Sequence, residues 1–231
     1  MIERAAAAPR NFFAGWYGKM PAAGDFIARR LPAAFSEPWD AWLQAAMAGS
    51  RERLGAGWDD AFLSMPAWRF VLGSGVVSGN AWAGLMVPSI DSVGRHFPLT
   101  VASALPDERL DAVATLLAAT PWFEAIEAIA FSALTPGADP ATVDSGIVQR
   151  PFRAGWLRSP RESDATVPAT AARIPRAQWA TPGIGEPRAA WLAETSELFE
   201  RCLALSDGLP DAVHYCAMMD GRWAEHGWRP H

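Results

Sequence analysis

The chain has 231 residues, of which half are apolar and 19% are charged, with twelve tryptophans among them. This composition excludes a disordered chain and requires a large core to bury the aromatic side chains. The formal charge of -5 and the pI near 5.4 supply no positive field for phosphate backbones or anionic lipid, so nucleic-acid binding and membrane-surface roles are not expected.

The first 135 residues predict a series of strands and helices. Strands are expected at 11–17, 68–72, 81–88 and 96–104, because these runs are apolar or aromatic and bounded by Gly and Pro. Helices are expected from Ser36 as N-cap to Gly55, at 58–64, after Asp107 as N-cap, and at 120–134, where apolar residues recur at helical spacing. The uncharged run 70–90 contains too many Gly, Ser and Asn residues for a membrane helix, and membrane insertion is not expected.

The second half is organised around proline. Five prolines between 159 and 187 predict a long loop. Strands near 190 and at 199–205 and a helix at 210–219 are expected to follow. Consecutive strands followed by helices, without regular β–α alternation, indicate a single α+β domain over 1–231, a mainly antiparallel sheet with helices packed on it.

Two opposite charges occupy the turn between the strands 81–88 and 96–104. Asp91 and Arg95 lie among glycine and proline residues there, and Lys19 and Asp25 occupy a similar loop at 18–26. Loops held by a rigid sheet commonly carry binding residues. A salt bridge that ties the two loops together is an equally good interpretation of these charges.

The sequence contains no recognisable catalytic or metal-binding motif. Residues 15–19 lack the spacing of a phosphate loop, and no Gly-x-Ser-x-Gly elbow occurs. The fragment from His214 to Cys216 has no second ligand pair, so no metal and no cofactor are expected. Cys202 and Cys216 are too few for a disulfide framework, and with no secretory signal at the start they indicate reduced thiols in the cytoplasm.

Several motifs in a fixed order resemble the TagF family of type VI secretion-associated proteins. They are Gly-Trp-Tyr-Gly-Lys-Met-Pro at 15–21, Gly-Asp-Phe at 24–26, Pro-Trp-Asp-x-Trp-Leu at 38–43, Pro-Ala-Trp-Arg-Phe at 66–70, and the stretch from Trp82 to Thr100. The resemblance is close over the first half, with 11–135 as its core. It is weaker at 208–210 and 219–223, and the chain departs from the family pattern near 190–192.

The resemblance implies a longin-like α+β fold and a cytoplasmic, non-enzymatic repressor that binds the forkhead-associated scaffold protein of the secretion system. It assigns no catalytic residue. The motif-matched candidates for partner binding or loop bracing are Lys19, Gly24, Asp25, Phe26, Arg69, Ser89, Asp91, Gly94 and Arg95. Two alternatives stay open: a small hydrolase or ligand-binding enzyme with a site near Asp91, Arg95 and His96, and an assembly factor that associates with itself.

Overall fold

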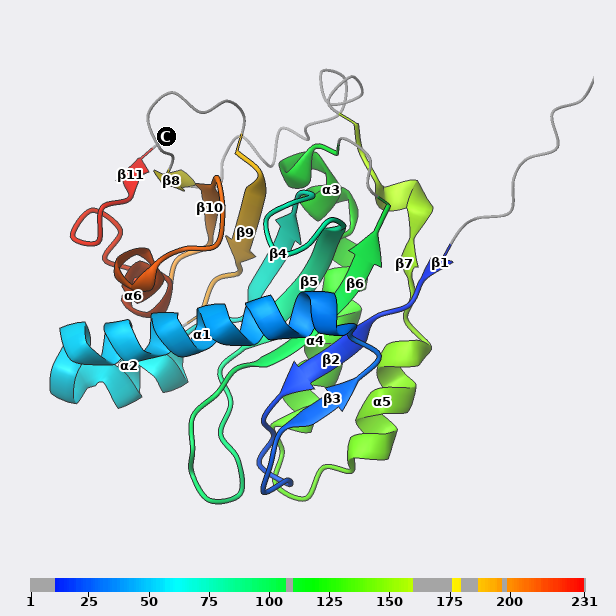
Figure 1. Ribbon diagram of the computed structural model, residues 1–231, viewed down its shortest axis with the longest axis horizontal. Coiled ribbons are helices and arrows are strands. Elements are labelled where there is room, and N and C mark those ends of the chain that lie inside the picture. The colour runs from blue at the N-terminus through cyan, green and yellow to red at the C-terminus, as the bar shows by residue number, and fades with distance from the viewer. Residues whose placement is uncertain (1–10, 107–109, 160–175, 180–186, 197–198, 231) are drawn as a thin grey trace, which may run out of the picture.

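The computed structural model describes residues 11–106, 110–159, 176–179, 187–196 and 199–230 (Figure 1). Its centre is a nine-stranded sheet in the order β11-β8-β10-β9-β4-β5-β6-β2-β3. The central strands are β4 (Trp68–Leu72), β5 (Ala81–Val87) and β6 (Leu99–Leu105). Every pair in this sheet is antiparallel except β10 (Cys202–Ser206) with β8 (Arg176–Trp179), which is parallel. The mainly antiparallel α+β class expected from the sequence is confirmed.

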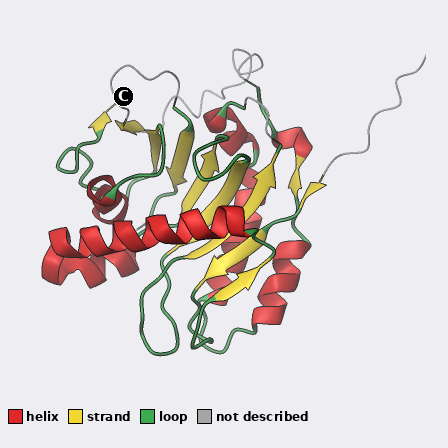
Figure 2. Ribbon diagram, viewed as in Figure 1, coloured by secondary structure: helices red, strands yellow, loops and turns green. Residues whose placement is uncertain are grey.

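Helices cover both faces of the sheet (Figure 2). On one face lie α1 (Ala33–Leu54), α2 (Trp58–Ser64) and α6 (Ala212–Asp220); on the other lie α3 (Ala112–Ala118), α4 (Thr120–Ala133) and α5 (Pro140–Val148). The two faces define two hydrophobic clusters. Because both faces are covered, the central strands are apolar at nearly every position instead of alternating.

Most tryptophans are core residues, as their spacing predicts. Among the residues whose burial is described, the buried tryptophans are Trp16, Trp39, Trp58, Trp68, Trp82, Trp122, Trp191 and Trp228, while Trp42 on α1 is only partly buried. Small residues opposite the rings make this packing possible. A Cβ at Gly84 on β5 would lie 2.3 Å from the Phe70 ring on the paired strand, so the ring occupies the space that a side chain at this position would need.

The N-terminal predictions need three corrections. The run 11–17 is not one strand, since β1 (Asn11–Phe12) pairs with β7 (Phe152–Arg153) in a separate sheet and β2 (Gly15–Gly18) joins the main sheet. The edge strand β3 (Ile27–Arg29) was not predicted. Helix α1 starts at Ala33 after an extended Pro32, and Ser36 lies inside its first turns, where its hydroxyl donates to the Pro32 carbonyl.

Later element boundaries also move. The strand expected from 96 begins at Leu99, the strand expected from 199 begins at Cys202, and the N-cap of α3 is Asp111, whose carboxylate accepts the N–H of Ala114. Asp107 lies outside the described residues. Helix α5, β7 and β11 (Arg229–Pro230) were not predicted, and β8 is a strand within the expected loop 159–187. Strand β9 (Ala189–Ala193), α2, α4, β4 and β5 match their predictions closely.

Within the described ranges, no single helix is long and apolar enough to cross a membrane. Helices α3 and α4 pass that test only as a pair, and they are bent by 70° at their junction.

Candidate functional site

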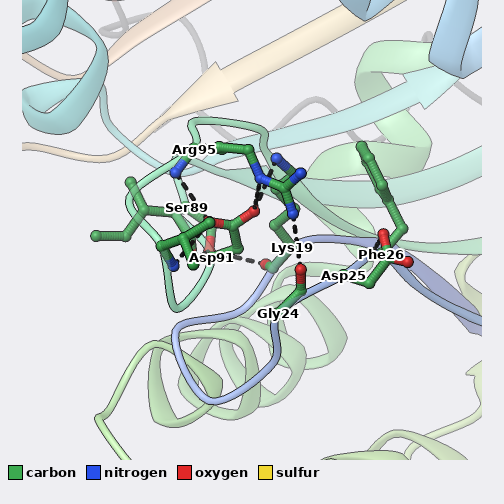
Figure 3. A network of polar contacts seen from close by, with 9 residues as sticks. Lys19, Gly24, Asp25, Phe26, Ser89, Asp91 and Arg95 are labelled. Carbon is green, nitrogen blue, oxygen red and sulfur yellow. Dashed lines mark hydrogen bonds and ion pairs between the residues drawn. The ribbon is translucent and has the colours of Figure 1, made fainter.

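Two loops meet at one end of the sheet, and polar contacts join them (Figure 3). The first, residues 19–26, connects β2 to β3; the second, residues 88–98, connects β5 to β6. The Lys19 Nζ lies 3.0 Å from Asp91 Oδ2, and the guanidinium of Arg95 donates from Nε to the same oxygen at 2.6 Å. Arg95 also donates from Nη2 to the carbonyl of Gly24, at 2.7 Å. A single carboxylate therefore holds cations from both loops.

Backbone hydrogen bonds complete this loop network. The hydroxyl of Ser89 donates to the Lys19 carbonyl at 2.8 Å, and the N–H of Ser92 donates to the Ala23 carbonyl at 3.0 Å. Inside the second loop, Asp91 Oδ1 accepts the N–H groups of Val93 and Arg95. The Asp91 side chain thus acts in the same way as a turn-capping aspartate while it also pairs with the two cations.

The electrostatics of Asp91 follow from this arrangement. Its side chain has no exposed surface. Burial alone would raise the pKa of Asp91, but the hydrogen bonds from the Arg95 backbone, Lys19, the Arg95 side chain and the Val93 backbone outweigh it and hold the pKa well below its ordinary value. Asp91 is therefore a charged structural group and lacks the proton that a general acid needs.

Glycine permits the sharp entry into the first loop. Gly18 has φ of +137°, and a Cβ there would lie 2.1 Å from the Pro98 carbonyl oxygen at the end of the second loop. Gly94 has φ of +83° at the tip of the second loop. Both conformations favour glycine, and at Gly18 the close approach of the two backbones requires it.

Aromatic packing supports the network from one side. The rings of Tyr17 and Phe26 stack with centroids 5.5 Å apart, and Phe97 packs edge-on against Phe26 at 4.8 Å. The Lys19 Nζ lies 5.1 Å from the centre of the Phe26 ring. The Tyr17 hydroxyl donates to Asp40 on α1 at 2.6 Å, which links the loops to that helix. Phe26 nevertheless remains 41% exposed, and Val93 is 70% exposed.

The other candidates lie apart from these contacts. Asp25 is exposed, and its carboxylate accepts the N–H of the adjacent Phe26 at 2.8 Å. Arg69 lies on β4 under α4, where it pairs with Glu127 at 2.8 Å and with Glu194 at 2.9 Å. The structure therefore brings together Lys19, Gly24, Ser89, Asp91 and Arg95, with Phe26 and Gly94 at their margin, and it separates Arg69 from them.

The enzyme alternative requires His96 to be paired with a carboxylate and close to a nucleophile. His96 packs edge-on against Trp58 and Phe62, and its Nε2 lies 3.8 Å from Asp59 Oδ1, beyond hydrogen-bond distance. Burial lowers the pKa of His96 despite the nearby Asp59. An open pocket of about 560 Å³ adjoins His96, and none of its nine described lining residues carries a hydroxyl or thiol. This geometry does not favour the hydrolase hypothesis.

No group of three or more His, Cys, Asp or Glu side chains that could hold a metal ion occurs among the described residues. Cys216 is buried, with Sγ donating to the carbonyl of Ala212, and His214 contacts the helix-capping Asp211 at 2.7 Å. Both side chains therefore belong to the packing and capping of α6.

Sequence reasoning missed the partners that α1 contributes to this region. Asp40, Gln44 and Arg51 line or support the space beside the second loop. The only sequence signal for these residues was the motif at 38–43, which includes Asp40. Its separation of 23 residues from Tyr17 gave no reason to connect the two before the chain folded.

Fold and site together define an α+β protein with a braced pair of loops at one end of its sheet. Residues 15–149 match the family model of the TagF N-terminal domain, described as type VI secretion system-associated. The chain is also similar to PA0076 from Pseudomonas aeruginosa PAO1, whose crystal structure was solved at 2.05 Å resolution. The two share 33% identity, with a TM-score of 0.71, over 90% of this chain and 94% of that one. No curated protein matches the chain.

The family match covers more than half of the chain. The chain therefore belongs to the TagF family, and it is a type VI secretion-associated protein.

Proposed function

We propose that this protein is a non-enzymatic, cytoplasmic repressor of type VI secretion that binds the forkhead-associated scaffold protein of the system. The binding surface is the pair of loops at 19–26 and 88–98, and 1–231 acts as one domain. Membership of the TagF family connects the chain to the secretion system. The observation that carries the choice of surface is the buried Lys19–Asp91 pair, which holds two exposed loops in one arrangement.

The two loops are preorganised, and this property favours them as a binding surface. A loop that is ordered before binding loses less conformational entropy when a partner docks on it. Here the ordered loops present apolar groups to solvent, Phe26 and Val93, beside the exposed guanidinium of Arg95. Aromatic and arginine side chains in such a setting are the groups most often found at the centre of protein interfaces.

Binding to the purified scaffold protein, measured by calorimetry, tests the proposal. The informative variant is Val93→Ser, because Val93 is the most exposed large apolar side chain among the described residues and its removal leaves the ion pairs in place. We expect about a fivefold loss of affinity, close to the 1 kcal/mol that only the more important residues of an interface contribute. The matched control is Val148→Ser at the C-terminal end of helix α5, also exposed and outside both loops, which should bind as the wild type does.

A deletion strain supplies the cellular readout. Loss of a repressor should raise secretion, and expression of the wild-type protein should restore it. If the purified proteins do not associate at micromolar concentrations and the deletion leaves secretion unchanged, the proposed function is wrong.

A further inference from the structure

A pocket of about 560 Å³ lies beside the loop network, between the last turns of α1, the start of α2 and the second loop. Its volume is within the range of known ligand sites. Met47 is partly exposed in the pocket, Trp58 and Phe97 lie almost fully buried in its wall, and Gln44, Arg51 and Arg95 contribute polar groups. It is therefore a mixed surface with two guanidinium groups at its edge.

Arg51 is poised to bind an anion. Its guanidinium carbon lies over the Trp58 ring, 4.0 Å from the ring centre, and a guanidinium held on an aromatic face in this way can still direct its N–H groups to a ligand. Its ion pair with Asp59 is long, at 3.8 Å, and both side chains are well exposed. A ligand carboxylate could replace that contact with two direct hydrogen bonds at little cost.

Arg95 presents a second cation whose position is fixed. Its Nε and Nη2 groups bond to Asp91 and Gly24, while 58% of the side chain is exposed. Lys19 already compensates Asp91, so the three side chains of Lys19, Asp91 and Arg95 together carry one net positive charge. That charge is available on the pocket side of the loop.

The pocket suits a peptide better than a bare phosphate. Many phosphate sites add a nest of free backbone N–H groups to their basic side chains, but the N–H groups of Gly94, Arg95 and Phe97 already donate within the loop, to Asp91 and Ser89. Gln44 donates its amide to Asp40, at 2.5 Å, which leaves its carbonyl oxygen as an acceptor. A peptide with acidic side chains complements these groups, because its backbone N–H can donate to the Gln44 oxygen and its carboxylates can pair with the two guanidinium groups.

We propose that this pocket binds an acidic segment of a protein partner. The carboxylates of the segment pair with Arg51 and Arg95, a backbone N–H donates to Gln44, and an apolar neighbour packs on the partly exposed Met47. The assignment of this segment to the scaffold protein rests on the function proposed above. The inference that the pocket binds an acidic segment is independent of that function.

Charge reversal at Arg51 tests the site, with a control on the same turn. Arg51→Glu removes the cation from the pocket. Arg53→Glu makes the same change in net charge and in the helix terminus, at an exposed position that does not line the pocket. Both full-length variants are first checked for an unchanged fold by thermal melting and circular dichroism.

The first measurement uses a probe of known chemistry. Amide resonances of the protein are followed by NMR during titration with the capped peptide acetyl-Leu-Asp-Glu-Leu-Glu-amide, its Asn/Gln analogue, and inorganic phosphate. Shifts from the acidic peptide should cluster at residues 44–58 and 94–97. The affinity should fall about tenfold in Arg51→Glu and less than twofold in Arg53→Glu. The uncharged analogue and phosphate should bind more weakly than the acidic peptide.

The second measurement uses the purified scaffold protein with the same two variants. Selective loss of affinity in Arg51→Glu supports the assignment to the scaffold, whereas equal affinities for the wild type and Arg51→Glu reject that assignment and leave the proposed function intact. If the wild type does not bind the scaffold at all, the proposed function fails, and the peptide titration alone decides on the pocket. Shifts outside the pocket, equal effects of both variants, or stronger binding of phosphate would overturn the inference.

Discussion

The ammonium group of Lys19, the only lysine in the chain, lies 3.0 Å from the carboxylate of Asp91, whose side chain is fully buried. These two residues belong to different loops, 72 positions apart, and their ion pair fixes the position of one loop relative to the other. Arg95 reaches the same carboxylate from the solvent side. The two cations therefore have different roles: Lys19 compensates the buried charge of Asp91, whereas the side chain of Arg95 is exposed to solvent.

This division predicts unequal effects of removing the two cations. Lys19→Met should lower the melting temperature by about 5 to 10 °C, because the remaining partner of Asp91 is largely exposed and solvated. Arg95→Ala should lower it by less than about 4 °C, yet it should weaken scaffold binding. Calorimetric melting and binding titrations measure both effects. Unchanged melting and unchanged affinity in Arg95→Ala would exclude a role for Arg95.

The network should also make stability depend on pH in the acid range. The folded-state pKa of Asp91 is below its ordinary value, so its contribution is complete above the unfolded-state pKa of about 4 and is lost as the pH falls through the folded-state value. Urea unfolding at pH 6 and pH 3.5 should show the wild type losing more stability than Asp91→Asn. Asp25→Asn, at an exposed loop position, is the control and should follow the wild type. Equal pH dependence of all three proteins would contradict this account.

Arg69 should be important for stability and unimportant for binding. Its side chain is 6% exposed and pairs with Glu127 on α4 and with Glu194 after β9. Arg69→Met should destabilise the protein by about 3 kcal/mol in urea unfolding, because it leaves Glu127 partly buried without its cation. The double variant Arg69→Met with Glu127→Met should recover part of that loss. A large change in scaffold affinity of the folded Arg69→Met protein would instead place Arg69 in the interface.

The two cysteines should be unreactive in the folded protein. Burial raises the pKa of Cys202 to about 12 and that of Cys216 to about 11, so almost no thiolate is present at pH 8. Ellman's reagent should label neither thiol in native conditions and both in denaturing urea. Rapid labelling of one thiol without urea would show that its part of the structure opens locally.

Local sequence was sufficient for the elements whose boundaries are written in a few residues. Strands β4 and β5 are apolar runs between Pro or Gly residues, and α4 begins at Thr120-Pro121 and stops shortly before Pro136 and Gly137. The motifs at 15–21 and 82–100 also identified the family and the two loops. Strands β3, β7 and β11 could not be found in this way, because segments of two or three residues are stable as strands only when a partner supplies the hydrogen bonds.

For the site, the sequence determined which charged residues occupy constrained turns, since glycine and proline restrict the backbone locally. The motifs made Lys19, Asp91, Arg95 and Arg69 candidates for the same site. Arg69, however, lies on a different part of the sheet. Only the tertiary structure decided that Lys19 and Arg95 both contact the buried carboxylate of Asp91. It also placed Arg51 of α1 in the wall of the same pocket as Arg95. Contacts of this kind depend on how strands and helices pack over tens of residues, because charge pairing is determined by distance and burial after folding and has no local signature.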